Sequence, residues 1–320
     1  MPPKRADEID EKVGLPKIHV FGVPMDLGQQ RRGVDMGPSA IRYAELHDTL
    51  INLGYTVRDH GNIRVPNAEE IRSRGRRSAG SYPRQGNAVF HMNAVVEVCT
   101  EIRDKVSKTV PVDDITICLG GDHSIALGTI SAANMRNPRG VLWVDAHADF
   151  NTPETSPSGN AHGMPLAALF GDGAPEMIAV SAGHELSASQ VVMIGLRSID
   201  PQERLRLRNA GIAVFTMADI DEHGMAAIAR QAIERLSVWD GLHVSLDMDA
   251  LDPEAAPGVG TPERGGLTTR EGHLLMELLA QSGLVRSMDL VEVNPIIDRQ
   301  NTTAELAVEL TASLFGQRTL

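Results

Sequence analysis

Residues 141–163 constrain the fold and the chemistry of this chain more than any other segment. The segment opens with an unbroken apolar run, residues 141–144, of the kind found in a buried parallel strand. Three potential metal ligands then follow at every second position, Asp145, His147 and Asp149. If extended geometry continues past the run, their side chains leave one face of the backbone together. Asp and His are also common in solvated loops, so the segment alone leaves both half of a metal site and a polar loop open.

Charge and aromatic content limit the partners that fit this chain. Its 320 residues include 30 Lys and Arg against 42 Asp and Glu, which gives a formal net charge of -12. Such a charge repels phosphate backbones and anionic membranes, and an aromatic content of 3% leaves few platforms on which bases stack. We therefore expect no nucleic-acid partner and no membrane partner.

The cysteines and the N-terminal residues favour a cytoplasmic protein. Cys99 and Cys118, the only cysteines, lie in apolar segments, which argues against a disulfide framework and for a reducing compartment. No secretion signal is expected in the first residues, and no run of about 18 apolar residues suggests a transmembrane helix. We expect residues 1–16 to be a loosely ordered lead-in to a single catalytic domain over residues 17–320.

Apolar runs alternate with helical periodicity along the chain. Strands are expected at residues 18–23, 55–57, 115–119, 141–145, 191–196, 212–216, 242–247 and 286–293. Helices are expected at about 38–53, 88–107, 124–135, from 201, and at 218–237, 269–281 and 302–315, whereas the arginine-rich residues 64–87 read as a solvated loop with at most a short helix. The alternation predicts an α/β fold, a three-layer α/β/α arrangement around a mainly parallel sheet of about eight strands. In such sheets ligands bind at the carboxyl ends of the strands.

Two further strand ends complete a candidate metal site. Asp247 and Asp249 follow the strand at 242–247, and His123 follows the strand at 115–119. The candidate ligands are therefore His123, Asp145, His147, Asp149, Asp247 and Asp249. Four buried carboxylates carry a charge of about -4, which two divalent ions would neutralise, and their oxygen atoms favour manganese or magnesium. Two such ions can share one water, lower its pKa and hold hydroxide for attack on carbon or phosphorus. Structural pairing with Arg or Lys is the alternative, but neither Asp cluster contains a basic residue.

These segments resemble a known enzyme family. The sequences GGDHS at 120–124, DAHAD at 145–149 and SLDMDALDP at 245–253 resemble, in order and spacing, the three signature segments of the ureohydrolases. The resemblance extends over nearly the whole chain, from residues 22–24 to 314–316. It implies an arginase-like fold, two Mn²⁺ ions per subunit, and assembly as a homotrimer or homohexamer.

Within that family the chain is most similar to the arginases. Asn151 and the segment SGNAHG, which begins at Ser158, resemble the loop that holds the substrate α-carboxylate, where agmatinases differ. The segment RSIDPQE resembles the one that meets the α-amino group, which implies that role for Asp200 and Glu203. The resemblance also implies a supporting role for Thr261 in the neighbouring loop.

Three residues are the candidates for catalysis. Glu292 ends the strand at 286–293 and is the candidate anchor for a guanidinium group, although an ordinary edge charge would look the same in sequence. His162 matches the proton shuttle of the family and has a suitable unperturbed pKa, whereas a lone His in a Gly/Asn loop is otherwise a surface residue. Asp149 counts both as a metal ligand and as a catalytic residue.

The expected function is hydrolysis of L-arginine to L-ornithine and urea, by attack of a metal-bridging hydroxide on the guanidinium carbon. An agmatinase or a guanidinobutyrase is the alternative within the family, and a catalytically silent, metal-stabilised scaffold is a remote one. Asn151, Ser158 and Asp200 favour arginase over agmatinase, because agmatine has no α-carboxylate to hold. A scaffold would need neither His162 nor Glu292.

Overall fold

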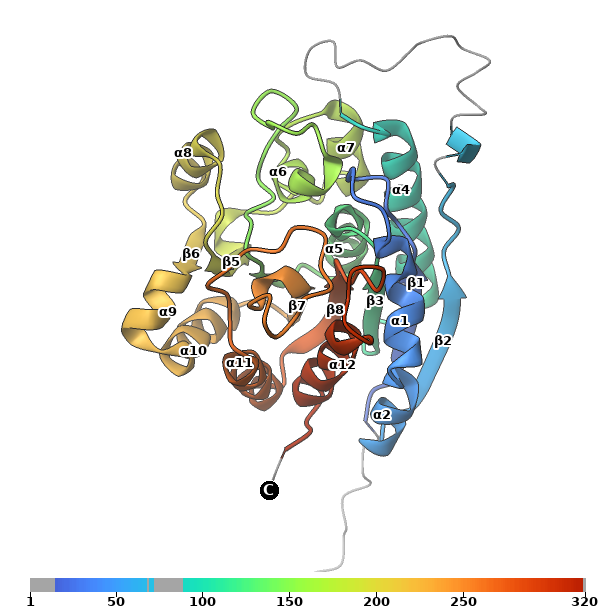
Figure 1. The fold of residues 1–320 in the computed structure, drawn as a ribbon, viewed down its shortest axis with the longest axis vertical. Helices are drawn as coiled ribbons and strands as arrows, with labels where there is room; N and C mark the ends of the chain where they lie inside the picture. The colour runs from blue at the N-terminus through green and yellow to red at the C-terminus, as the bar shows by residue number, and fades with distance from the viewer. Residues whose placement is uncertain (1–14, 68, 72–88, 319–320) are drawn as a thin grey trace, which may run out of the picture.

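Eight strands form the centre of the molecule, with helices on both faces (Figure 1). The computed structural model describes residues 15–67, 69–71 and 89–318. Residues 1–14 of the expected lead-in, and residues 68 and 72–87 of the expected arginine-rich loop, lie outside the described residues. The strands are β1 (Ile18–Val23), β2 (Val57–Asn62), β3 (Ile115–Gly120), β4 (Gly140–Val144), β5 (Val191–Leu196), β6 (Ala213–Thr216), β7 (Leu242–Asp247) and β8 (Val285–Val291).

The sheet is parallel throughout the described residues. Its strand order is β2-β1-β3-β8-β7-β4-β5-β6, and each neighbouring pair runs in the same direction. The predicted three-layer α/β/α arrangement with about eight strands is confirmed. Helices cover both faces of such a sheet, which explains why β3, β5 and β7 are buried along their whole length and why β5 reads as a continuous apolar run.

Alternate residues of the inner strands enter two separate cores. In β4, Leu142 and Val144 pack into one core, and Val141 and Trp143 pack into the other, as the two-residue period of a strand requires. The first core lies under α1 (Gly37–Tyr43), α2 (Leu46–Asn52), α9 (Met217–His223), α10 (Met225–Leu236), α11 (Thr269–Ser282) and α12 (Thr302–Leu314). The second lies under α4 (Met92–Thr109), α5 (Ala126–Arg136), α6 (Pro165–Leu169), α7 (Pro175–Ile178) and α8 (Pro201–Ala210).

The structure corrects several expected boundaries. The single helix expected at 38–53 is two helices, because Glu45 adopts a left-handed conformation with φ of 66° between α1 and α2. The single helix expected at 218–237 is likewise interrupted at Gly224, which has φ of 78° and joins α9 to α10. The strand expected at 55–57 begins only at Val57, and the short helices α6 and α7 were not predicted. No described helix combines the length and the apolar character needed to cross a membrane.

Candidate functional site

The strand order brings four chemically active segments to one edge of the sheet. β3, β8, β7 and β4 are adjacent, and their carboxyl ends carry His123, Glu292, Asp247 and Asp145 in that order. Sequence separations of up to 169 residues are thereby reduced to contact distances, such as 3.0 Å between the His123 amide nitrogen and Glu292 Oε1. Parallel topology, and not proximity in sequence, therefore assembles the site.

A glycine allows the loops after β1 and β3 to approach each other. A Cβ atom added to Gly121 would lie 2.0 Å from the carbonyl oxygen of Met25, and no larger residue fits there without moving backbone. The amide of Asp122 donates to the same carbonyl oxygen at 2.8 Å. This close approach fixes the position of His123, the residue that follows.

The expectation of extended geometry after Val144 is wrong. β4 ends at Val144, the chain bends at Ala146 and His147, and Asp149 adopts a left-handed conformation with φ of 50°. The bend is held by the amide of His147, which donates to Asp145 Oδ1 at 2.7 Å. A non-glycine residue in this conformation is strained, and such strain is typical of functional sites.

The six predicted ligands nevertheless converge in two groups. His123, Asp145 and Asp149 form one group and Asp145, His147 and Asp249 the other, and within each group the ligand atoms lie within 4.8 Å of one another. Asp145 belongs to both groups. Asp247 joins the first, because its Oδ2 lies 3.2 Å from His123 Nδ1.

The arrangement around His123 fits a metal ion. Its Nδ1 lies 3.1 Å from Asp145 Oδ2 and 3.1 Å from Asp149 Oδ2. Among the described residues this buried nitrogen has no hydrogen-bond partner of acceptable geometry. A ring nitrogen and several carboxylate oxygens aimed at a common point, without hydrogen bonds between them, are typical of a cation site.

The ionisation of the cluster also indicates cations. Burial and the charge of Asp145 raise the pKa of Asp149 to about 6. Burial, followed by the charges of Asp249 and Asp145, raises the pKa of Asp247 well above its usual range. Burial would raise the pKa of Asp145 too, but the adjacent His123 and His147 rings lower it. Asp149 and Asp247 therefore resist ionisation unless positive charge is supplied, which divalent ions would do.

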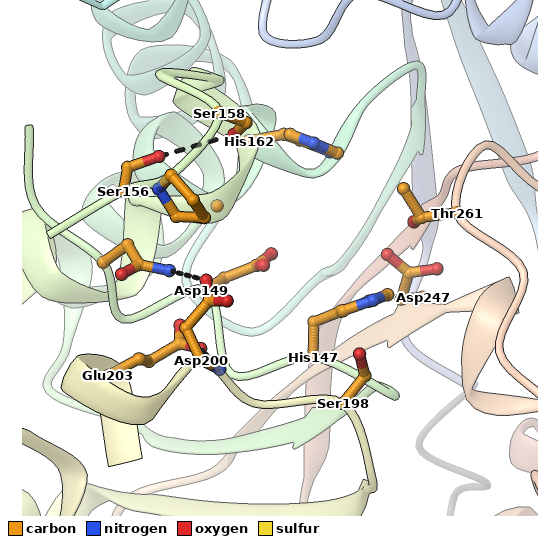
Figure 2. A pocket seen from close by; sticks show the side chains of 13 residues that line it. His147, Asp149, Ser156, Ser158, His162, Ser198, Asp200, Glu203, Asp247 and Thr261 are labelled. Atoms are coloured by element: carbon orange, nitrogen blue, oxygen red, sulfur yellow. Dashed lines mark hydrogen bonds between the residues drawn. The ribbon is translucent and has the colours of Figure 1, made fainter. Parts of the chain in front are cut away.

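A cavity of about 140 Å³ opens above this cluster (Figure 2). Figure 2 shows His147, Asp247 and Thr261 on one side of the cavity and Asp200 with Glu203 on the other. Its lining residues are His147, Asp149, Asn151, Ser156, Pro157, Ser158, His162, Gly163, Ser198, Asp200, Glu203, Asp247 and Thr261. The cavity therefore joins the metal cluster to the residues expected to bind an amino-acid head group.

The start of α8 forms the acidic wall of the cavity. Asp200 is the N-cap of α8 and Glu203 its third residue, and the two form a capping box in which Glu203 Oε2 accepts the amide of Asp200 at 3.3 Å. Burial raises the pKa of Glu203 to about 7, although its Oε1 also accepts the amide of Phe150 at 2.8 Å. The same helix start thus holds two carboxyl groups at the cavity.

Asn151 and Ser158 lie on the loop that faces α8. The Asn151 amide nitrogen donates to Asp200 Oδ2 at 3.1 Å, and its oxygen accepts from Thr155 Oγ1 at 2.9 Å. Ser158 is exposed, and its hydroxyl accepts from the amide of Asn160 at 3.1 Å. An amide group has two N–H donors, so Asn151 keeps one for a ligand.

Half-buried His162 and buried Glu292 form a pair beside the metal cluster. His162 Nδ1 lies 3.0 Å from Glu292 Oε1. Burial would lower the pKa of His162, but its hydrogen bond with Glu292 and the charge of that carboxylate raise it to about 9. Burial would likewise raise the pKa of Glu292, but the hydrogen bond and the charge of His162 hold it below its usual range. Both groups are therefore charged near neutral pH.

Glu292 does not occupy the position that the sequence suggested. β8 ends at Val291, one residue before Glu292. Glu292 itself has a left-handed backbone conformation with φ of 65°, so the chain leaves the strand direction there. It is 1% exposed and is not among the residues that line the cavity. Three donors surround its carboxylate: the His162 ring, the His123 amide and the Gln29 side chain.

Several supporting residues escaped the sequence reasoning. Gln29 donates to Glu292 Oε2 at 2.8 Å from a point 263 residues earlier in the chain. The Trp143 ring stacks on His123 at 4.1 Å between centroids, and its Nε1 donates to Asp145 Oδ2 at 2.9 Å. Thr261, which was predicted, donates to Asp249 Oδ2 at 2.8 Å. Of these residues, only Trp143 could have been found from the sequence, because it lies in the apolar run two residues before the candidate ligand Asp145.

The fold and the site together define a class of protein: a metal-binding α/β enzyme with paired His/Asp clusters at the carboxyl ends of a parallel sheet. Comparison with known proteins makes this specific. The family model described as "Arginase family" matches residues 16–316. The chain therefore belongs to the arginase family of hydrolases.

Individual relatives agree with this assignment. The arginase of Bacillus subtilis is 46% identical over 305 residues, which cover 95% of this chain and 99% of that protein. The solved arginase of Bacillus caldovelox superposes with a TM-score of 0.88 at 45% identity, covering 95% of this chain and 100% of that one. The arginase of Entamoeba histolytica, solved in complex with L-ornithine, gives a TM-score of 0.85 at 32% identity, with 95% of this chain and 100% of that chain covered.

Proposed function

We propose that this chain is an arginase, which hydrolyses L-arginine to L-ornithine and urea. One observation carries the proposal: a single cavity joins the His/Asp cluster to Asn151, Ser158, Asp200 and Glu203. L-arginine has the matching chemistry, since a cationic guanidinium lies at one end and an α-amino acid group at the other. The relative from Entamoeba histolytica was solved with L-ornithine, the amino-acid product of this reaction.

The metal end is proposed to hold two Mn²⁺ ions. The ligands would be His123, Asp145, His147, Asp149, Asp247 and Asp249. Oxygen atoms with two imidazoles suit manganese, and the absence of cysteine from the set disfavours a structural zinc site. When bound, the two ions neutralise the carboxylates and supply a nucleophile derived from water at neutral pH.

The amino-acid end would orient the substrate. Asn151 has one free N–H, and with the Ser158 hydroxyl it would bind the α-carboxylate. Asp200 and Glu203 would bind the α-amino group. These contacts would bind the head group of the substrate and direct its guanidinium to the metal end.

His162 and Glu292 would act on the guanidinium and on the proton. Glu292 stays ionised and accepts three hydrogen bonds, which leaves a lone pair for a cation. His162 is charged near neutral pH, and its Nδ1 is held by Glu292, so Nε2 remains to protonate the leaving amine of ornithine. Asp149 would serve in catalysis by holding metal beside His162.

The assembly, compartment and domain organisation also remain proposals. We propose a homotrimer or homohexamer in the cytoplasm, where the buried, unpaired Cys99 and Cys118 would stay reduced. We propose residues 17–320 as a single catalytic domain, because one sheet takes strands from Ile18 to Val291. Light scattering after gel filtration tests the assembly against a chain mass of 34.5 kDa.

Urea release by the manganese-loaded protein tests the activity. L-arginine and agmatine are compared side by side, with a chelated sample as control. Urea from L-arginine alone, lost on chelation, is the expected result. Urea from agmatine would contradict the roles of Asn151, Ser158 and Asp200 while keeping the metal chemistry, and urea from neither substrate would favour the silent scaffold.

A further inference from the structure

A carboxylate that the reaction does not use lies in the middle of the sheet. Asp289 belongs to β8 and is 0% exposed. Its Oδ2 accepts from Thr129 Oγ1 at 2.6 Å and lies 3.0 Å from His243 Nε2, whereas its Oδ1 has no partner among the described residues. Among the described residues its ion-pair partner is His243, and no Lys or Arg pairs with it. A buried carboxylate with one oxygen unpaired and no Lys or Arg beside it lowers the stability of a fold, so its position calls for a functional reason.

Asp289 is connected to the candidate metal ligand His123 through one hydroxyl. Ser245 Oγ lies 2.9 Å from His123 Nε2 and 3.5 Å from Asp289 Oδ2. β7 carries Ser245 and β8 carries Asp289, and the two residues are paired across the sheet. The serine hydroxyl therefore lies between the ring and the carboxylate.

The role of His123 Nδ1 decides which group donates in each of these hydrogen bonds. His123 Nδ1 faces the carboxylates of Asp145 and Asp149 and must present a lone pair to bind a metal. The proton of a neutral imidazole then sits on Nε2, which donates to Ser245 Oγ. The hydroxyl of Ser245 is left to donate to Asp289, a carboxylate that only accepts.

The rest of the ring is held by Trp143. The two rings stack with an interplanar angle of 14°, so Trp143 fixes the plane of His123. Stacking does not decide which nitrogen of His123 carries the proton or which edge of the ring faces the cluster. Those two properties depend on the hydrogen bond to Ser245.

We propose that Asp289 is a positioning residue that, through Ser245, fixes the tautomer and orientation of His123 for metal binding. The inference rests on the proposed function, because it requires His123 to be a metal ligand. Outer-shell partners of this kind orient ligands and raise their affinity for metal. Asp289 would act on the first ligand group alone, because that group contains His123, whereas the second group takes its imidazole from His147. Its loss is therefore expected to weaken one of the two bound ions and to spare the other.

The test measures the Mn²⁺ affinity of the intact protein. Two methods are used: competition with a chelating dye, and the electron paramagnetic resonance signal of free Mn²⁺. Asp289→Asn and Ser245→Ala are each expected to weaken one of the two ions ~10-fold or more. Ser245→Ala removes a single hydroxyl, so it keeps the test open if the Asp289 variant fails to fold. Thr129→Val is the matched control, because it removes a hydrogen bond to the same oxygen of Asp289 but lies off the path to His123. It is expected to lower the unfolding temperature and to leave Mn²⁺ affinity unchanged.

A double variant shows whether Asp289 acts through Ser245 or whether the two residues affect Mn²⁺ binding independently. If Asp289 acts only through Ser245, adding Asp289→Asn to Ser245→Ala weakens binding no further. Multiplied effects in the double variant, or unchanged affinity in both single variants, would overturn the proposal. An unmodified protein that fails to bind two Mn²⁺ ions would instead overturn the proposed metal site, so the two failures are distinguishable.

Discussion

The two ends of the cavity are built from different kinds of structure. At the metal end, His123, Asp145 and Asp249 are at most 1% exposed and lie directly beyond the ends of β3, β4 and β7. At the amino-acid end, Ser158 is exposed on a loop and Asp200 is half-buried at the start of α8. Strand ends in a packed sheet hold closely spaced charges at fixed distances, whereas loops can vary without disturbing the sheet. Under the proposed function, chemistry and substrate choice thus belong to separate parts of the molecule.

Removing a metal ligand should have the largest effect of any change in the cavity. Asp249→Ala, or Asp149→Ala, is expected to lower kcat by ~1000-fold or more, because several kcal/mol of charge stabilisation are lost with the metal. Metal analysis and urea release on the same sample check this. Asp221→Ala, at an exposed position on α9, is the control and should keep both metal and activity. A metal-free Asp249→Ala protein with normal turnover would contradict the proposed chemistry.

His162→Ala should separate proton transfer from metal binding. We expect kcat to fall about 100-fold, the usual contribution of a general acid or base, while two Mn²⁺ ions stay bound. His162 is not one of the six proposed ligands, and its Nδ1 contacts Glu292. Saturating L-arginine isolates the effect on kcat, and His184→Ala at an exposed position serves as control. An unchanged rate at saturation would show that His162 is not the proton shuttle.

A change at the amino-acid end should act on binding and not on chemistry. Asn151→Ala is expected to raise KM for L-arginine about tenfold, which is the loss of one hydrogen bond to a charged group. KM for agmatine should stay unchanged, because agmatine has no α-carboxylate. Steady-state kinetics with both substrates check the prediction. An equal rise in KM for both substrates would mean that Asn151 supports the pocket in general, for example through its contact with Asp200.

The smallest expected effect is a dependence of KM on pH at the acidic wall. Burial raises the pKa of Glu203 to about 7, so its carboxyl group is negative above that pH and neutral below it. Only the charged form attracts an α-ammonium group, so KM should rise as pH falls from 8 to 6, by about tenfold at most. Glu203→Gln should have a higher KM that no longer varies over this interval. A variant that kept the pH dependence of the unmodified protein would assign the titration to another group.

The fold was predictable because its signals are local. The apolar run at residues 191–196 matches β5 residue for residue. Asp200 and Glu203 have the spacing of a capping box, which is a local signal for the start of α8. The helix break at Glu45 was missed because nothing in that residue type indicates a left-handed backbone, whereas the break at Gly224 falls at a residue type that favours one. The extended arrangement expected for Asp145, His147 and Asp149 failed for the same reason as at Glu45.

The residues that form the site were predictable, and the contacts between them were less so. All six candidate ligands come together, because each follows a strand that ends at the same edge of a parallel sheet. Gln29 escaped prediction because it is a polar residue in a loop, 263 residues from the carboxylate that it contacts. The strand expected to include Glu292 ends at Val291, and the burial of Glu292 had no sequence signal.

The sequence by itself determined the parallel α/β sheet, the six ligand candidates and the resemblance to the arginase family. These depend on short apolar runs and on fixed spacings of Asp and His, which are properties of neighbouring residues. Only the tertiary structure decided that Asp145 is shared by both ligand groups, that Glu292 pairs with His162, and that Asp289 reaches His123 through Ser245. The reason is physical: burial, orientation and hydrogen-bond direction depend on strands that are adjacent in space and distant in sequence.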